Sequence, residues 1–326
     1  MNVLPFSAPY LLAPMEGVTE PAFRRVVLAE NDAAALGGTF SEFARITNHA
    51  LSAKVLARHL NLDERAGTAP RPVGLQLMGS QAEHVAASAA NAVEAGAPLV
   101  DLNFGCPAKG ALRSCAGSGM LDDPASIERL VRLTVEAVAG AVPVTGKIRA
   151  GGDDDSRVEE LARAVENGGA ALLSVHCRTR AEKYADTADW QRLVRARTAV
   201  SIPVCGNGGI ECHRDLERLR VETGCAFSMV ARGALRDPWI FSSTPRDRSD
   251  MRRFFRAYDA AMAADGNREH RRFARWKQLL KHWTACGWPA DLEQRNDWMR
   301  SPDFRTLEAK LDAWSNVALA ADSDAR

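Results

Sequence analysis

The sequence predicts an α/β fold, a (β/α)8 TIM barrel followed by an all-helical C-terminal domain. Short apolar runs alternate with amphipathic helical stretches eight times, and polar or Gly-rich residues recur where the predicted strands end. Parallel strands that helices cover on both faces appear in a sequence as nearly continuous apolar runs. The length of 326 residues fits a barrel of about 250 residues with an appended domain.

The eight predicted strands follow one another at intervals that leave room for helices. They are Leu11–Ala13, Ala35–Phe40, Val73–Leu77, Leu99–Asn103, Val144–Ile148, Ala171–Val175, Val204–Gly206 and Phe227–Ala231. Stretches such as Ala82–Ala95 and Pro124–Ala139 are predicted as helices between them. A doubly wound open sheet is the alternative, because it is built from the same alternation of strands and helices.

The segment Ser242–Asp250 is polar, charged and contains proline, which predicts a linker. The composition changes after it to a helical, basic and Trp-rich chain, and six of the seven tryptophans lie at or beyond Trp239. We therefore expect a barrel domain over residues 1–243 and a helical domain over residues 251–326.

The composition bounds the class of protein. Apolar residues make up 46% and charged residues 25%, as in ordinary globular proteins. No apolar run is long enough to span a bilayer, and no basic residue precedes the short apolar stretch at the N-terminus. Seven cysteines without regular spacing or a CxxC pair argue against a disulfide framework and a structural zinc site. We expect a cytoplasmic monomer with no membrane or metal partner.

Charge is distributed unevenly along a chain whose net charge is only +1. Residues 251–300 contain 11 Lys and Arg against 6 Asp and Glu, a local charge of +5, whereas the last 26 residues contain 3 against 5. A local basic excess is expected where one surface meets a polyanion.

The predicted strands end in polar or glycine residues that could bind a ligand or take part in a reaction. In a barrel these strand ends converge on one mouth, where barrel enzymes keep their active sites. The strand-end residues are Pro14-Met15-Glu16-Gly17, Gln76, Asn103-Phe104-Gly105-Cys106-Pro107, Lys147 with Arg149, His176 with Arg178, Asn207-Gly208-Gly209 and Ala231-Arg232-Gly233. The Gly-rich turns after the last two strands predict a phosphate site, because glycines let backbone N–H groups approach an anion and Arg232 adds charge. The alternative is that these glycines only make tight turns.

Two residues at the mouth are candidates for redox chemistry. Lys147 can stabilise the anionic N1–O2 edge of a reduced flavin, although a strand-end lysine can also simply extend its head to solvent. Cys106 lies in a loop shaped by Asn, Gly and Pro. A thiol with an ordinary pKa near 8.5 is protonated at neutral pH and can act as a general acid. Cys205, Cys225 and Cys286 are expected instead to be inert core residues.

The motifs at these positions resemble one family, the tRNA-dihydrouridine synthases. The runs that carry the resemblance are LLAPMEGVTEPAFRR, VGLQLMGS, VDLNFGCPAK, GKIRAG, VHCRTR followed by Tyr184, GNGGI and MVARGAL, in that order. They cover the barrel from about Leu11 to Phe241, and LNFGCP is the most specific of them. The resemblance implies an FMN-dependent enzyme that uses NADPH to reduce the C5–C6 bond of a uridine in tRNA.

The segments SEFAR, with Arg45, and ARWKQLLKHW resemble the bacterial C-type members, which implies uridine 16 of the D-loop as the target. The resemblance makes Cys106 the acid that protonates C5, while N5 of the reduced FMN delivers hydride to C6 of a base that has left its stack. It assigns FMN contacts to Pro14, Met15, Glu16, Gln76, Lys147, His176, Asn207, Gly208, Gly209, Ala231 and Arg232. It assigns tRNA contacts to Arg45, Asn103, Arg178, Tyr184, Arg275, Lys277 and His282.

The sequence departs from the family pattern at four places. Cys177 and Ala231 replace glycines, Gly209 stands where an acidic residue is common, and Cys115 is an additional cysteine in the loop after Lys109. Two other functions stay open. One is an FMN barrel oxidoreductase that acts on a small pyrimidine metabolite, and the other is a catalytically silent tRNA-binding protein, against which the intact Cys106 and Lys147 argue.

The region Phe273–Trp283 is predicted as an amphipathic helix. Its apolar stripe is Phe273, Trp276, Leu280 and Trp283, and its opposite face carries Arg271, Arg275, Gln278 and His282, with Lys277 and Lys281 along the flank. We expect this basic face to bind the tRNA backbone. The alternative is a solvated basic face on an ordinary bundle helix.

Overall fold

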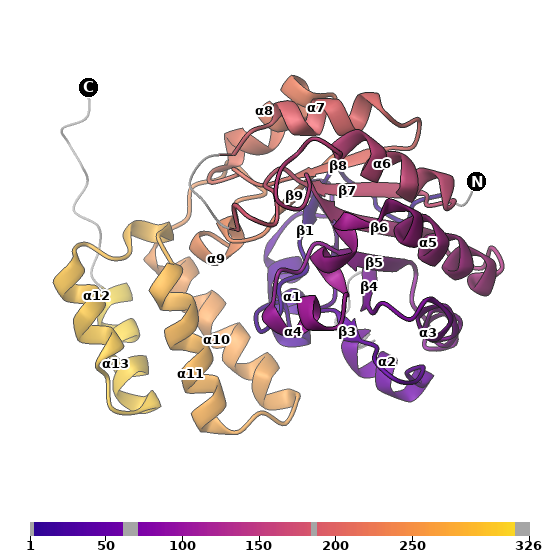
Figure 1. Cartoon of the computed structure of the whole chain (residues 1–326). Helices are drawn as coiled ribbons and strands as arrows, with labels where there is room; N and C mark the ends of the chain where they lie inside the picture. The colour runs from indigo at the N-terminus through magenta and orange to yellow at the C-terminus, as the bar shows by residue number, and fades with distance from the viewer. Residues whose placement is uncertain (1–2, 61–70, 184–187, 317–326) are drawn as a thin grey trace.

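A closed parallel barrel forms the first part of the chain in the computed structural model, which describes residues 3–60, 71–183 and 188–316 (Figure 1). Within these residues the strands are β1 Tyr10–Leu12, β2 Leu36–Phe40, β3 Ala44–Arg45, β4 Val73–Met78, β5 Val100–Phe104, β6 Val144–Arg149, β7 Leu172–His176, β8 Val204–Asn207 and β9 Phe227–Val230. They are parallel, in the order β2-β1-β9-β8-β7-β6-β5-β4-β3, and a further pairing of β2 with β4 closes the barrel. The TIM-barrel prediction is confirmed, and the open-sheet alternative is wrong.

Helices follow the strands and surround the barrel. They are α1 Pro21–Glu30, α2 Ala53–Leu60, α3 Ala82–Glu94, α4 Lys109–Arg113, the 3₁₀ helix η2 Gly117–Asp122, α5 Pro124–Val138, α6 Val158–Asn167, α7 Gln191–Thr198, α8 His213–Thr223 and α9 Gly233–Arg236. Helix α5 shows why its ends were predictable. The Asp123 carboxylate accepts a hydrogen bond from the Ser126 N–H, Pro124 occupies the first turn, and Ala139 ends the helix in the left-handed conformation.

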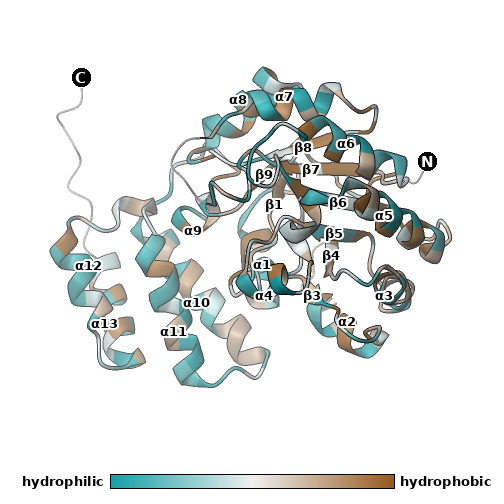
Figure 2. Ribbon diagram, viewed as in Figure 1, coloured by the Kyte–Doolittle hydropathy of each residue, from teal (hydrophilic) through white to brown (hydrophobic). Residues whose placement is uncertain are grey.

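Alternation along the strands separates an inner from an outer core. Leu11 faces the barrel interior, where it packs with apolar residues from β2, β7, β8 and β9, whereas its neighbour Leu12 belongs to the outer cluster. Phe6 packs against this inner cluster, and its ring centroid lies 5.8 Å from that of Phe40 and 5.7 Å from that of Phe227. Figure 2 shows apolar residues along the central strands and polar residues on the outer helices α7 and α8.

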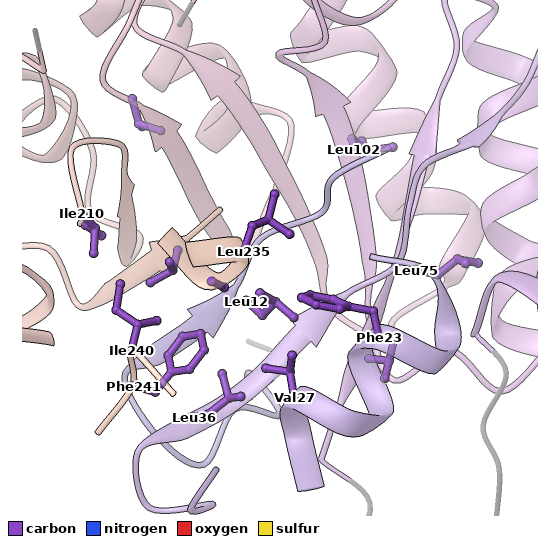
Figure 3. Packing of buried hydrophobic residues seen from close by; sticks show 14 of the residues in the cluster. Leu12, Phe23, Val27, Leu36, Leu75, Leu102, Ile210, Leu235, Ile240 and Phe241 are labelled. Atoms are coloured by element: carbon purple, nitrogen blue, oxygen red, sulfur yellow. The ribbon is translucent and has the colours of Figure 1, made fainter. Parts of the chain in front are cut away.

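The outer core extends from the barrel into the C-terminal helices. Figure 3 shows Leu12 and Leu36 of the strands beside Val27 of α1 and Phe241, which follows α9. The remaining helices are α10 Arg248–Ala264, α11 Glu269–His282, the 3₁₀ helix η3 Ala285–Gly287, α12 Leu292–Met299 and α13 Phe304–Ser315. The ring of Phe254 on α10 lies 6.3 Å from Phe23 of α1 and 5.3 Å from Trp283, so one continuous core crosses from the barrel to these helices.

The structure corrects two sequence expectations. The linker predicted to end at Asp250 ends at Asp247, because the Asp247 carboxylate accepts hydrogen bonds from the Ser249 and Asp250 N–H groups and starts α10 at Arg248. The two-residue strand β3 was not predicted, because two residues are too few to show a strand pattern. No helix among the described residues is long and apolar enough to cross a membrane.

Candidate active site at the mouth of the barrel

Strand register brings the predicted mouth residues of β5 to β8 together. Asn103 of β5 is paired with Lys147 of β6, and His176 of β7 is paired with both Arg149 of β6 and Asn207 of β8. Because all strands are parallel, these residues lie at the carboxyl end of the barrel. The observed register therefore places these strand-end residues side by side, as expected for one mouth.

The Cys106 loop is fixed by its neighbours. Asn103 Oδ1 accepts hydrogen bonds from the N–H groups of Gly105 and Cys106, at 3.0 and 2.9 Å. The Ser118 hydroxyl donates to the Cys106 carbonyl at 3.0 Å, and Arg149 Nε donates to the Gly105 carbonyl at 2.7 Å. The side chain of Cys106 is half-buried, and this burial raises the pKa of its thiol. At neutral pH the group is therefore a thiol that can donate a proton.

A buried acid lies beneath this loop. Asp101 is 1% exposed and accepts hydrogen bonds from Thr145 Oγ1 at 2.6 Å and from Gln76 Nε2 at 2.7 Å. Gln76 Oε1 in turn accepts from Asn103 Nδ2 at 2.8 Å. Asp101 was not among the predicted site residues. Its position two residues before Asn103 on one strand was the available signal, since such residues face the same side.

Lys147 and His176 form the centre of the mouth. Lys147 Nζ lies 3.4 Å from Asn207 Oδ1, and burial lowers the pKa of the amine to about 8, so the cation still predominates at pH 7. Burial and the nearby cations Lys147, Arg149 and Arg178 hold the pKa of His176 well below its usual value. The imidazole is thus neutral, and Arg178 Nη1 lies 3.4 Å from its Nε2.

The turn after β8 depends on two consecutive glycines. Gly208 and Gly209 have φ angles of +109° and +73°. A Cβ on Gly208 would lie 2.7 Å from Cys177 Sγ, and one on Gly209 would lie 2.6 Å from the Ala188 Cβ. Glycine is therefore needed at both positions. Ala231 and Arg232 lie in the neighbouring turn after β9.

The predicted cofactor loop Pro14-Met15-Glu16 follows β1 and is tied into a turn, because the Met15 N–H donates to Thr19 Oγ1 at 2.8 Å and the Val18 N–H donates to the Met15 carbonyl. Pro14 and Met15 are half-buried, whereas Glu16 is exposed. The next residue, Gly17, contacts α11 through its carbonyl oxygen.

The predicted tRNA contacts divide into two groups. Arg45 of β3 is exposed beside the Cys106 loop and donates to the Gly110 carbonyl at 2.7 Å, while Arg178 is buried at the mouth. Tyr184 lies outside the described residues. On α11, Arg275 is paired with Glu20, Lys277 Nζ donates to the Ser301 carbonyl at 2.8 Å, and His282 is exposed. The α11 cations therefore do not all face solvent.

Arg149 was predicted at the mouth but was assigned neither a cofactor nor a tRNA contact. Besides its bond to the Gly105 carbonyl, its Nη1 donates to the carbonyls of Thr179 and Lys183, at 3.1 and 2.9 Å. It thus holds the loop after β5 against the loop after β7. Among the unexpected cysteines, Cys115 is exposed with a φ of +48°, and Cys177 is buried against Gly208.

Comparison with known proteins gives one family. The model of the family described as dihydrouridine synthase (Dus) matches residues 11–296. A tRNA-dihydrouridine(16) synthase of Cupriavidus necator is 34% identical over 95% of this chain and 98% of its own. Proteins with the same name from Ralstonia nicotianae and Haemophilus influenzae are 38% and 37% identical, over 71% and 70% of this chain and 70% and 74% of their own.

Proposed function

This chain belongs to the dihydrouridine synthase family, and we propose that it reduces uridine 16 of tRNA to 5,6-dihydrouridine with FMN as cofactor and NADPH as electron donor. It is an oxidoreductase acting on a CH–CH bond, and its substrate is tRNA. The family implies a flavin. We infer FMN because the Gly-rich turns after the last two strands, Gly208–Gly209 and the turn at Arg232, are where barrels commonly bind a single phosphate.

One observation carries the proposed chemistry, the half-buried Cys106 thiol whose pKa is raised at the mouth. A bound reduced flavin supplies hydride to C6 of the uracil. Cys106 donates the proton to C5, so that hydride and proton together saturate one C=C bond. Lys147 would supply positive charge to stabilise a reduced, anionic flavin, and Arg149 keeps the Cys106 loop in place.

We propose position 16 as the target because the relatives are named tRNA-dihydrouridine(16) synthases. The base must leave its stack to enter the mouth. Arg45 at the rim and Arg178 inside it are the groups we propose to contact the RNA and the base. Tyr184 is proposed on the motif alone.

The decisive experiment maps dihydrouridine in tRNA from cells that lack this protein. We expect the loss of dihydrouridine at position 16 alone and its return when the purified protein, FMN and NADPH are added. Reduction of free uracil or uridine at a rate that tRNA does not improve would favour a metabolite enzyme. Tight tRNA binding without a flavin spectrum would favour a silent binding protein.

A further inference from the structure

We propose that Asp101 is a positioning residue for the proton-donating loop, because it sets the direction of a chain of hydrogen bonds that runs through Gln76 and Asn103 to Cys106. The proposal takes the role of Cys106 from the proposed function. The chain of hydrogen bonds itself belongs to the fold and can be tested without the reaction.

The chain begins at a group that can only accept. Burial raises the pKa of Asp101 to about 6, so the carboxyl group is still ionised at pH 7. An ionised carboxylate has no hydrogen to donate. Its two oxygens accept from the Thr145 hydroxyl and from the Gln76 amide nitrogen, at 2.6 and 2.7 Å. The amide of Gln76, which is fully buried, must therefore turn its nitrogen inward and its oxygen toward the mouth.

This orientation passes to the next amide. Because Gln76 presents its oxygen, Asn103 donates from Nδ2 at 2.8 Å and turns its own oxygen to the loop. That oxygen accepts from both the Gly105 and the Cys106 N–H groups. If either amide were reversed, two N–H donors or two oxygens would face each other at a buried link, which costs about 1–3 kcal/mol for each unsatisfied group.

The same chain limits what Asn103 can offer a ligand. Both lone pairs of its oxygen are used by the loop, and one of its two amide hydrogens is used by Gln76. One N–H donor remains. Asn103 can therefore recognise an acceptor on a pyrimidine, O2 or O4, but not the N3–H group.

Asp101 could also act through charge, because its negative charge raises the pKa of Lys147 and so opposes the lowering by burial. Two variants separate the explanations. Asp101→Leu keeps a similar shape but removes both acceptors. Asp101→Asn removes the charge but keeps one oxygen that can accept from Gln76. The asparagine variant keeps the direction when its amide nitrogen donates to the Thr145 hydroxyl oxygen and its own oxygen accepts from Gln76. Control of direction therefore predicts a much smaller loss for asparagine than for leucine, whereas an effect of charge predicts an equal loss in both.

The experiment uses the full chain and two measurements. The first is hydrogen exchange of the backbone amides of residues 104–106 in flavin-free protein, and the second is single-turnover dihydrouridine formation at saturating tRNA. For Asp101→Leu we expect exchange about tenfold faster and single turnover slower by about 10²-fold, with the KM for tRNA little changed. Ser228→Ala on β9 is the control, since it also removes a buried polar side chain from a strand, one whose hydroxyl donates to the Leu216 carbonyl at 2.7 Å.

Several outcomes overturn the proposal. They are wild-type loop exchange in Asp101→Leu, equal loss in Asp101→Asn, and an equal effect of Ser228→Ala. If the leucine variant does not fold, Gln76→Leu interrupts the same chain one link nearer the loop, and normal loop protection there has the same meaning. A wild-type protein that forms no dihydrouridine would contradict the proposed function, while loop exchange would still decide the role of Asp101.

Discussion

Glu20, the residue before helix α1, is paired with Arg275 of helix α11 across the seam between the barrel and the C-terminal helices. The two side chains are only 10% and 13% exposed. The Tyr258 hydroxyl donates to the other carboxylate oxygen of Glu20, and Arg275 also donates to the Gly17 carbonyl. A residue expected to contact RNA therefore joins two parts of the protein next to the proposed flavin loop.

Arg275→Ala should destabilise the protein strongly. The change leaves the Glu20 carboxylate buried without its cation, and breaking a buried pair in this way typically costs about 3–5 kcal/mol. Chemical unfolding measures the effect, and Lys281→Ala, on the exposed part of the same helix, is the control. An Arg275→Ala protein as stable as wild type but weak in tRNA binding would instead favour a direct RNA contact.

The RNA surface of α11 is better tested at its exposed cations. Arg271, Lys281 and His282 are all exposed, but partial desolvation and nearby cations lower the pKa of His282, so its neutral form predominates at pH 7. Replacing Arg271 and Lys281 with alanine should weaken tRNA binding and flatten its salt dependence by about one unit of slope or less for each lost phosphate contact. Binding is measured across a salt titration, with Arg132→Ala on α5 as the control. An unchanged slope would indicate that these cations do not contact phosphates and that the RNA binds instead at the rim near Arg45.

Cys106→Ala should retain flavin and tRNA binding but lose most dihydrouridine formation. The loss of a general acid typically lowers a rate by about 10²- to 10⁴-fold. Turnover is measured under saturating tRNA and NADPH. Cys115→Ala, in the exposed turn after α4, should stay close to wild type. Near-normal turnover of the Cys106 variant would mean that another group donates the proton.

The pH dependence of alkylation tests the protonation state of Cys106 directly. Burial raises the pKa of its thiol, and only the thiolate is nucleophilic, so alkylation should be slow at pH 7 to 8 and accelerate above the ordinary thiol range. Peptide mass spectrometry follows each cysteine separately, and the exposed Cys115 and Cys212 should be modified first. Rapid labelling of Cys106 at pH 7 would exclude the acid role.

The purified protein should carry FMN and not FAD. The phosphate site proposed at the Gly208–Gly209 turn would hold one phosphate, and the sequence has no GxGxxG motif following a strand and opening a helix. Mass spectrometry of the heat-released cofactor identifies it. FAD, or no flavin after reconstitution, would be incompatible with the proposed cofactor.

The sequence was sufficient for the barrel because its strands are buried on both faces and end in glycine or polar residues. Each of the eight predicted strands overlaps an observed strand, and α3 and α5 match their predicted helices to within one residue. Strand β3 and the start of α10 depend instead on local pairing and on one capping aspartate. Such features do not follow from hydrophobic periodicity.

The site was predictable where residues end strands, and less so where their partners are distant in sequence. Asn103, Cys106 and Lys147 stand at strand ends and could be predicted. Asp101 looked like one more strand residue, because its role depends on Gln76, 25 positions earlier. The pairing of Arg275 with Glu20, 255 positions away, follows only from how the C-terminal helices pack on α1.

The uneven distribution of the tryptophans lets their emission report on a different part of the protein from a bound flavin. Six of the seven lie at or beyond Trp239, and all six are buried in or beside the C-terminal helices. Trp190 stands apart in the barrel, where its indole donates to the Gly208 carbonyl at 3.0 Å. Ultraviolet emission therefore reports mainly on the helices and their seam, while the visible absorption of a bound flavin reports on the mouth. Comparing the two during denaturation would reveal whether the seam makes both halves melt as one unit.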